Sequence, residues 1–403
     1  MRCRNYKSEF FKSEDISELS FVGRLLFLGL ISGTSMDGVD AALARFGAHE
    51  PVETVRCRTF PYPEDLRARL LAAIAPAARL TLHELGTLDV DVGRHFADAA
   101  LALLREANVA SRTVNAIGSH GQTIRHHPLP PTPYSLQIGC GATIAARTGI
   151  VTVADFRRLD IACGGEGAPL VPPFHAACMG SADEDRIVVN IGGITNLSLI
   201  PKACDTATLG FDTGPGNCLM DEWVARHRGT GFDEGGAWAA SGRVVPALLD
   251  ALLAQAYFAQ TPPKSTGREL FNLALVERAL ADLQQPATTL DPADVQSTLC
   301  ELTVESLACS IEAHVPGRGT DIYVCGGGAR NKELMTRLAR RLTPRAVLDT
   351  DALGIDAGFI EALAFAWYAR RRMSNVPTRL TTSDTPHAIC LGAVHAPCSV
   401  AET

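Results

Sequence analysis

The stretch GLISGTSMDGVDAALARF, residues Gly29 to Phe46, contains two β-strand patterns separated by a glycine-rich turn. An apolar run ends at the turn Gly33 to Gly38, and alternating apolar and polar residues resume after it. Backbone N–H groups hold a phosphate chain best where glycines let the main chain approach and adopt positive φ. The turn therefore fits a phosphate clamp, although glycine and aspartate also serve the geometry of an ordinary tight hairpin.

The same order of elements occurs a second time, starting at Arg186. The segment RIVVNIGGITNLSLI predicts strand, glycine-rich turn and strand, and a third strand and a helix follow, as they do after the first hairpin. Each half continues with a long helix, a strand that runs into a glycine-containing turn, a further strand and a helix. In the first half, Thr81 and Glu84 give this long helix a capping-box signature. Sequence identity between the halves is slight, so the duplication is inferred from element order alone.

Two such α/β units, each a mixed sheet with helices on its faces, leave a cleft between them. The second and third glycine-rich turns, Asn190 to Asn196 and Gly326 to Gly328, are expected to point into that cleft with the first. The third precedes a helix that opens near Asn331, where an anion can meet a helix N-terminus. None of the turns is a Walker A loop or a GxGxxG fingerprint, but three at matching positions are hard to explain by accident.

Composition limits the class of partner. At 403 residues and 46% hydrophobic, the chain is long enough for two domains. A formal net charge of −7, without a block of lysine or arginine, argues against nucleic acid. The twelve cysteines form no CxxC pair and no zinc spacing, which is typical of reduced thiols in a cytoplasmic protein. No run approaches the ~20 apolar residues that span a bilayer, so no membrane association is expected.

These features predict three parts of the chain. Residues 1–24 lack the apolar core and cleavage site of a signal peptide, and are expected to form a loose extension. Residues 25–182 form the first α/β unit, which the C-terminal segment 374–403 is expected to join. Residues 183–373 form the second unit, because the polar stretch from Met179 to Arg186 precedes the second hairpin.

Asp212 is the strongest candidate for acid–base chemistry. It stands where a strand ends and the glycine-rich turn GPGN enters a helix, so its carboxylate is expected to face the cleft as a general base. The alternative is an aspartate that only caps the local turn. His120, in GSHGQTIRHH, either binds a substrate hydroxyl or satisfies its own loop.

Three further positions have two interpretations each. Arg157 and Arg158 follow a short strand, where a guanidinium clamps a carboxylate bidentately or pairs with a nearby aspartate as structural support. Lys264 to Gly267 is a mobile loop over the cleft or a simple connector, and the connector is the slightly favoured interpretation. Glu361, on a late helix, faces the cleft or solvent.

With these residues assembled, the sequence resembles the anhydro-N-acetylmuramic acid kinases from about Phe27 to Leu391. The resemblance rests on several long motifs: GLISGTSMDGVDAAL, AIGSHGQTIRH, VADFRRLDIACGGEGAPLVPPFH, NIGGITNLS, GFDTGPGNCLMDEW, DEGGAWAASG, PKSTGRELFN, CGGGARN and EALAFAW. It implies an α/β fold of two duplicated actin-like (ribonuclease H-like) domains, with mixed sheets that flank a central nucleotide cleft. The N-terminal extension has no counterpart in the family pattern.

The resemblance also implies a double reaction in cell-wall sugar recycling. Water opens the 1,6-anhydro bridge at C1 of 1,6-anhydro-N-acetylmuramic acid while ATP phosphorylates O6, which gives N-acetylmuramic acid 6-phosphate. Asp212 matches the catalytic base, and Asp37 is expected to hold Mg²⁺. His120, Arg157, Arg158 and Glu361 are hypotheses for substrate binding, an arginine being suited to the lactyl carboxylate. The expected ATP-binding residues are Gly33, Thr34, Ser35, Met36, Asp37, Gly38, Val39, Asp40, Gly192, Gly193, Gly326, Gly327, Gly328 and Asn331.

The family resemblance further suggests a cytoplasmic homodimer, and two alternatives stay open for the activity. Another sugar kinase of the same superfamily would use Asp212 to deprotonate a sugar hydroxyl without breaking a glycosidic bond. An ATP-gated actin-like binding protein would normally carry an added domain, and only about 35 residues follow EALAFAW, fewer than a domain needs.

Overall fold

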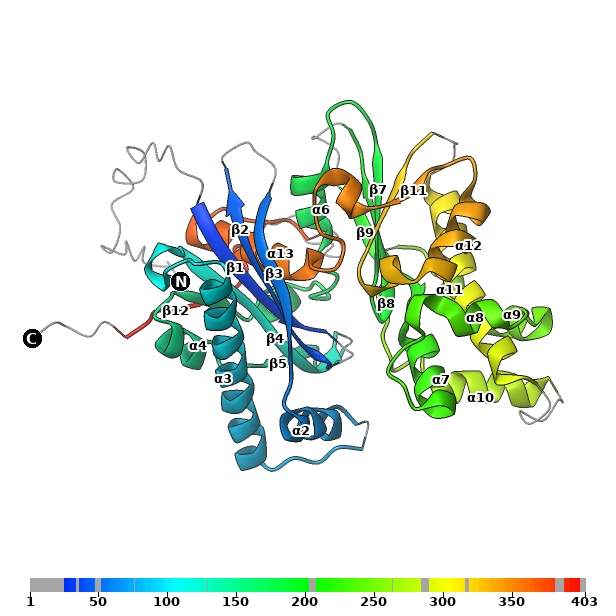
Figure 1. Cartoon of the computed structure of the whole chain (residues 1–403), viewed down its shortest axis with the longest axis horizontal. Coiled ribbons are helices and arrows are strands. Elements are labelled where there is room, and N and C mark those ends of the chain that lie inside the picture. Colours follow the sequence, from blue (N-terminus) through cyan, green and yellow to red (C-terminus); the bar gives the residue numbers. More distant parts are fainter. Residues whose placement is uncertain are drawn as a thin grey trace, which may run out of the picture.

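The computed structural model describes residues 25–33, 36–47, 52–75, 77–128, 130–202, 208–262, 264–283, 290–315, 319–380 and 388–398. These residues form two β-sheets with helices around them (Figure 1). The first sheet has the strand order β12-β6-β4-β1-β2-β3, with β5 paired to β4, and the second has the order β11-β10-β7-β8-β9. The strands are β1 (Leu25–Ser32), β2 (Gly38–Phe46), β3 (Glu53–Pro61), β4 (Ala116–His127), β5 (Tyr134–Ile138), β6 (Thr152–Ala154), β7 (Arg186–Ile191), β8 (Ile194–Ile200), β9 (Leu209–Pro215), β10 (Ile322–Cys325), β11 (Val347–Asp349) and β12 (Ala393–His395).

The pairing directions of the two sheets are the same. β1, β2 and β3 form an antiparallel meander, as β7, β8 and β9 do. β4 and β6 then continue the first sheet in parallel with β1, as β10 and β11 continue the second in parallel with β7. The duplicated element order is therefore confirmed, and with it the predicted fold of two actin-like, ribonuclease H-like units.

The helices pack on the faces of these sheets. The capping box predicted at the start of α3 is formed, because the Thr81 hydroxyl accepts the Glu84 N–H at 3.2 Å and Glu84 Oε2 accepts the Thr81 N–H at 2.7 Å. The helices are α2 (Glu64–Ile74), α3 (Leu82–Glu106), α4 (Gly141–Thr148), α5 (Arg158–Ala162), α6 (Pro172–Met179), α7 (Cys218–Arg228), α8 (Ala237–Ser241), α9 (Pro246–Leu253), α10 (Leu273–Asp282), α11 (Pro292–His314), α12 (Lys332–Leu342) and α13 (Ile360–Met373). Within the described residues, no helix combines the length and apolar character needed to cross a bilayer.

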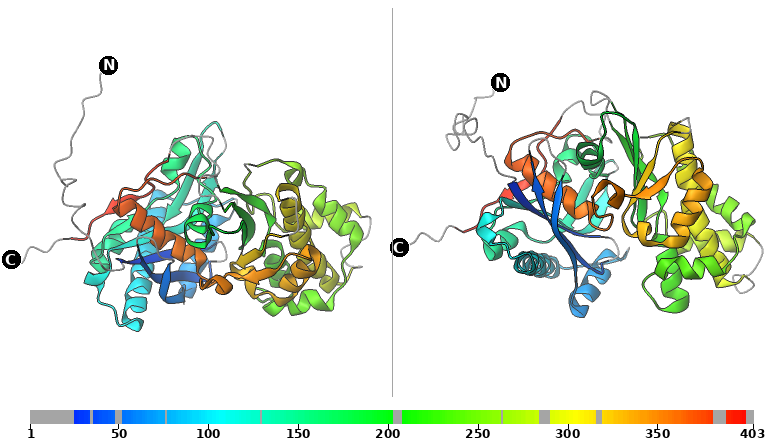
Figure 2. Two further views of the ribbon diagram at one scale, coloured as in Figure 1. Left: turned by 90° about the horizontal axis from the view of Figure 1, so that it is seen from above. Right: turned by 45° about the horizontal axis from the view of Figure 1, so that its top comes forward.

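Helix α13 corrects the expected end of the second unit at residue 373. It packs against β1, β2 and β4 of the first sheet, while α6, which ends the first half, packs against β8 of the second sheet. Figures 1 and 2 show α13 in orange against the first sheet and α6 in green beside the second. A boundary at residue 373 does not separate the two units, because the last helix of each half of the sequence packs against the sheet of the other half. β12, in the C-terminal segment, pairs antiparallel with β6 at the edge of the first sheet.

Three apolar clusters hold this arrangement together. One lies in the first unit among β1, β2, α2 and α3, and one lies in the second unit around α7, α10, α11 and α12. The third joins the units, because it contains side chains of β1 and β2, of β7 and β10, and of the helices α6 and α13. We call it the joint core.

Candidate active site

The first glycine-rich turn connects β1 to β2 at one side of the space between the two units. The Gly33 carbonyl accepts hydrogen bonds from Gln122 Nε2 and from the Met36 N–H, both at 3.3 Å. Met36 is buried and has a φ of 50°, which brings the chain sharply round. Thr34 and Ser35, both expected at the phosphates, lie outside the described residues.

The end of the turn is partly explained by packing. A Cβ on Gly38 would lie 2.4 Å from the Phe60 carbonyl oxygen, so glycine is required here by the close pairing of β2 with β3. The Val39 side chain is fully buried in the core of the first unit, which leaves only its backbone for a ligand. Asp40 accepts a hydrogen bond from the Thr59 hydroxyl at 2.5 Å. Burial raises the pKa of Asp40 to about 6, and the charges of Asp37 and Glu361 add to this.

Asp37 faces the second unit. Its side chain is exposed at the turn. Burial raises the pKa of Asp221, in the first turn of α7, to about 7, with Arg268 opposing and the charge of Asp37 adding to the rise. The charge of Asp37 on the first unit therefore acts on Asp221 of the second. No group of three metal-ligating side chains occurs among the described residues, so a divalent cation bound here would take most of its ligands from phosphates and water.

The second turn supports the start of α7. The Gly192 carbonyl accepts the Asn217 N–H at 2.8 Å, and the Gly193 carbonyl accepts the N–H groups of Gly216 and Cys218 at 2.9 and 3.1 Å. These bonds hold the hairpin of the second sheet against the helix N-terminus, and the expected contact of Gly192 and Gly193 with the phosphates stays a prediction.

The third turn lies beside the second. A Cβ on Gly326 would be 2.4 Å from Asn190 Oδ1, and one on Gly328 would be 2.4 Å from Ile191 Cγ2. Both glycines are therefore needed to let the turn approach β7. Gly327 is more open, since the nearest atom to its added Cβ is Asn217 Nδ2 at 3.5 Å. Asn331 caps α12, because its Oδ1 accepts the Leu334 N–H at 3.1 Å.

Asp212 is held firmly at the middle of β9. Its side chain is 7% exposed, and its Oδ2 accepts the Thr266 N–H at 3.0 Å. The Asp212 carbonyl accepts the Tyr257 hydroxyl at 2.7 Å, and its N–H donates to the Lys264 carbonyl at 3.2 Å. One carboxylate oxygen is thus fixed by the main chain, which orients the other.

The environment of Asp212 suits a general base near neutral pH. Burial raises the pKa of Asp212 to about 7, and the negative charge of Glu166 adds to the rise. The Thr266 N–H and the Arg157 guanidinium oppose it by stabilising the ionised form. A carboxylate with such a pKa is basic enough to accept a proton and is about half ionised at neutral pH.

Arg157 connects the other candidates. Its Nε donates to His120 Nε2 at 2.8 Å, and its Nη1 donates to the Gly167 carbonyl at 2.6 Å. His120 Nδ1 lies 3.0 Å from the Gly121 carbonyl, so the neutral ring carries its proton on Nδ1. Burial, with the neighbouring arginine, holds the pKa of His120 well below its usual range. His120 is thereby a neutral acceptor for Arg157.

Glu361 also belongs to this group. Its Oε1 accepts a hydrogen bond from Asn190 Nδ2 at 3.4 Å, which joins α13 to β7. Burial raises the pKa of Glu361, and Arg157 opposes the rise. The charges of Glu361 and Asp212 both act on the Arg157 guanidinium, and Arg157 Nε donates to His120, so these four residues interact as one electrostatic group.

Arg158 does not belong to this group. Its side chain is 65% exposed and its Nε donates to Asp155 Oδ1 at 2.7 Å, which is the structural pairing weighed as the alternative. Arg157 is the N-cap residue of α5 and Arg158 its first residue, and successive side chains at the start of a helix point in different directions.

Sequence reasoning missed several residues of the site. The segment from Lys264 to Gly267, for which a simple connector was the slightly favoured interpretation, supplies the N–H group that binds Asp212. Tyr257 and Glu166 were not singled out for the site at all, although both adjoin Asp212. The lysine and glycine of PKSTG were the only available signal, since a backbone N–H leaves no mark in a sequence.

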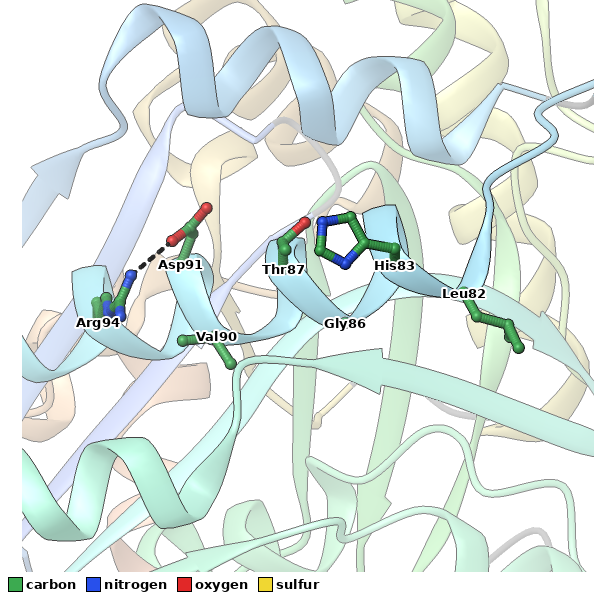
Figure 3. Close-up of a pocket in the computed structure, with 7 residues that line it drawn as sticks. All are labelled: Leu82, His83, Gly86, Thr87, Val90, Asp91 and Arg94. Atoms are coloured by element: carbon green, nitrogen blue, oxygen red, sulfur yellow. Dashed lines mark hydrogen bonds and ion pairs between the residues drawn. The ribbon is translucent and has the colours of Figure 1, made fainter.

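A surface hollow elsewhere on the protein is not part of this site. Its walls, including His83, Asp91 and Arg94, all come from the first turns of α3 (Figure 3). Since one helix lines it and no second element closes it, the hollow offers little to enclose a small ligand.

Comparison with known proteins agrees with this arrangement. The sequence model of one family, described as Anhydro-N-acetylmuramic acid kinase, matches residues 25–397. The chain belongs to the anhydro-N-acetylmuramic acid kinase family. A member of that name from Xanthomonas campestris pv. campestris (strain 8004) is 51% identical over 358 residues, which are 88% of this chain and 93% of the relative. Another from Coxiella burnetii (strain Dugway 5J108-111) is 44% identical over 370 residues, or 92% of this chain and 97% of the relative.

Solved structures similar to this kinase are remote. The activator of the 2-hydroxyisocaproyl-CoA dehydratase from Clostridium difficile with bound ADPNP is 10% identical, with a TM-score of 0.43 over 88% of this chain and 100% of that one. A ROK family glucokinase from Streptomyces griseus in complex with glucose and AMPPNP is 14% identical, with a TM-score of 0.36 over 86% of this chain and 99% of that one. Similarities this low say nothing about the substrate of the kinase.

Proposed function

We propose that this kinase converts 1,6-anhydro-N-acetylmuramic acid, ATP and water into N-acetylmuramic acid 6-phosphate and ADP. The observation that carries the proposal is the setting of Asp212. It is a buried carboxylate with a pKa of about 7, fixed by the Thr266 N–H and adjacent to Arg157. A water that donates to the other carboxylate oxygen would be activated for attack on C1 of the sugar.

The reaction needs only this one acid–base group. As the water oxygen bonds to C1, the C1–O6 bond breaks, Asp212 takes the water proton, and O6 accepts the γ-phosphoryl group of ATP. Phosphoryl transfer thus replaces the general acid of an ordinary inverting glycosidase. We assign Arg157 to the carboxylate of the lactyl group, since its guanidinium interacts with the charge of the base and, with a pKa of about 10, stays charged at physiological pH.

The nucleotide is assigned to the three glycine-rich turns. Gly327 would meet the phosphates through its backbone, because the nearest atom to an added Cβ lies 3.5 Å away, whereas the Met36 and Gly192 N–H groups already donate within the protein. Asp37 would hold Mg²⁺ through water, and the cation would neutralise the phosphate charge. Asn331 and the carbonyls of Gly192 and Gly193 already have internal partners, so we assign these residues to shaping the site.

The reaction is tested by mass spectrometry of the product formed in ¹⁸O-labelled water. Wild type should give a 6-phosphate with one ¹⁸O at C1, read early because the reducing sugar slowly exchanges that oxygen. Asp212→Asn should lose most of the activity, while Glu277→Gln, at an exposed ion pair with Arg226, should keep it. An unlabelled phosphorylated product would indicate an ordinary sugar kinase, and full activity of Asp212→Asn would remove Asp212 from the mechanism.

The family resemblance and the sequence composition also support a cytoplasmic homodimer. Light scattering of the purified chain measures its mass in solution, and a mass of one chain would contradict the dimer. Cell fractionation tests the compartment.

A further inference from the structure

Glu166 is a carboxylate that the proposed reaction leaves unused. It lies between α5 and α6, and its Oε2 atom is covered but has no hydrogen-bond partner among the described residues. Covered polar atoms nearly always have a partner, and a carboxylate oxygen without a donor is costly. The unpartnered Oε2 atom of Glu166 therefore indicates that a bound ligand supplies the hydrogen-bond donor that the protein lacks there.

The loop that carries Glu166 is rigid. Gly167 has a φ of 70°, and its N–H donates to Asp160 Oδ2 at 2.7 Å. The Gly165 N–H donates to the Asp160 carbonyl at 2.9 Å, and the Gly167 carbonyl accepts Arg157 Nη1 at 2.6 Å. The residues on both sides of Glu166 are therefore fixed, so its position does not depend on the glutamate itself.

The charge of Glu166 acts on the catalytic carboxylate. Its negative charge contributes to the raised pKa values of both Asp212 and Tyr257, which belong to the second unit. The loop that holds it also receives Arg157, which contacts His120. Glu166 is therefore followed directly by the residue that binds Arg157, and its charge acts on Asp212 from the first unit.

The chemistry of the substrate limits which group can donate to Glu166 Oε2. An ionised carboxylate only accepts hydrogen bonds. In the anhydro sugar a single oxygen, O6, bridges C1 and C6, and O3 carries the lactyl ether, so the ring offers two donors, the acetamido N–H at C2 and the hydroxyl at C4. We propose that Glu166 orients the sugar by accepting a hydrogen bond from one of these two donors. This inference rests on the proposed function.

Steady-state kinetics of Glu166→Ala and Glu166→Gln test the inference. Loss of a hydrogen bond to a charged acceptor should lower kcat/KM roughly 10- to 100-fold for Glu166→Ala, mainly by raising the KM for the sugar. The KM for ATP should not change. Glu166→Gln should recover part of the loss because its amide oxygen still accepts. Both variants should move the acid limb of kcat/KM to lower pH, since a charge next to Asp212 is removed, and a merely structural residue would not do so.

Two sugar analogues identify the donor. If the C4 hydroxyl is bound, the 4-deoxy analogue should be poor for wild type and no poorer for Glu166→Ala. If the acetamido N–H is bound, an N-methylacetamido analogue should instead be a poor substrate for wild type and no poorer for Glu166→Ala. The inference is overturned if the wild type is active and Glu166→Ala leaves the KM for the sugar unchanged. It is also overturned if the loss caused by each analogue and the loss caused by the substitution multiply in the variant. A wild type inactive on the anhydro sugar instead overturns the proposed function, and the inference with it. Melting curves and the matched variant Glu277→Gln control for folding.

Discussion

Adjacent residues of one type can have opposite surroundings. Arg157 is engaged by His120 and Gly167 within the site, whereas Arg158 is exposed and paired with Asp155. The sequence indicated that an arginine was useful in this segment but not which one, because the choice depends on where α5 begins: Arg157 is its N-cap and Arg158 its first residue. Asp212, in contrast, was recognisable from the glycine-rich turn that follows it, although β9 continues to Pro215 and Asp212 lies at its middle rather than at the end of a strand. The groups that shift the pKa of Asp212 could not be predicted, because they come from distant segments of the chain.

The pH dependence distinguishes the two arginines. Activity should rise with pH as Asp212 loses its proton, with a midpoint near its pKa of about 7. Arg157 lowers this pKa, so Arg157→Met should move the acid limb to higher pH and reduce kcat/KM on that limb, roughly tenfold for every pH unit that the limb moves. Arg158→Met should stay within about twofold of wild type, since an exposed ion pair contributes little. A pH–rate profile of both variants tests this difference. An acid limb that does not move in Arg157→Met would contradict the proposed effect of Arg157 on the pKa of Asp212.

At the scale of the elements, strands and hairpins were predictable because alternation and turn residues act locally. The capping box of α3 was predictable for the same reason. The position of α13 was not, because its partners on β1 and β4 are far away in the sequence. Nothing in a local pattern shows that the last helix of one half covers the sheet of the other half, and the predicted boundary at 373 failed for that reason.

Two glycines let α13 approach this sheet, which gives a test of the packing. A Cβ on Gly29 would lie 1.7 Å from the Ala362 carbonyl oxygen, and one on Gly118 would lie 2.0 Å from the Phe365 carbonyl oxygen. Gly29→Ala must therefore push the helix backbone, with Glu361 at its start, away from β1. We expect a loss of about 3 kcal/mol or more in the free energy of unfolding, together with reduced activity.

The matched control for that prediction is Gly86→Ala. Gly86 lies within α3, and a Cβ there would meet nothing within 4 Å. Since alanine is the better helix former, this variant should gain roughly 0.5–1 kcal/mol. Urea unfolding of both variants gives the two free energies. A Gly29→Ala protein as stable as wild type would show that α13 does not rest on β1 as closely as described.

For the whole molecule, the joint core determines how the two units behave together. It contains Phe27 and Ile31 from the first sheet, Val188 and Tyr323 from the second, and Phe174 from α6 between them. Because these side chains are buried only while both units are folded, losing one unit exposes apolar surface of the other. The fold thus has two sheets, each with a core of its own, and a third core that joins them, which element order alone did not reveal.

Calorimetry should accordingly show one cooperative unfolding transition whose calorimetric and van't Hoff enthalpies agree. Phe174→Ala removes a fully buried ring from the joint core, and Phe271→Ala removes one from the core of the second unit. Each should cost about 3–5 kcal/mol and lower the same single transition, because neither unit is stable alone. Two transitions in the wild type, or a Phe271→Ala protein in which only part of the heat absorption moves to lower temperature, would mean that the units unfold separately and that the joint core contributes little to their coupling.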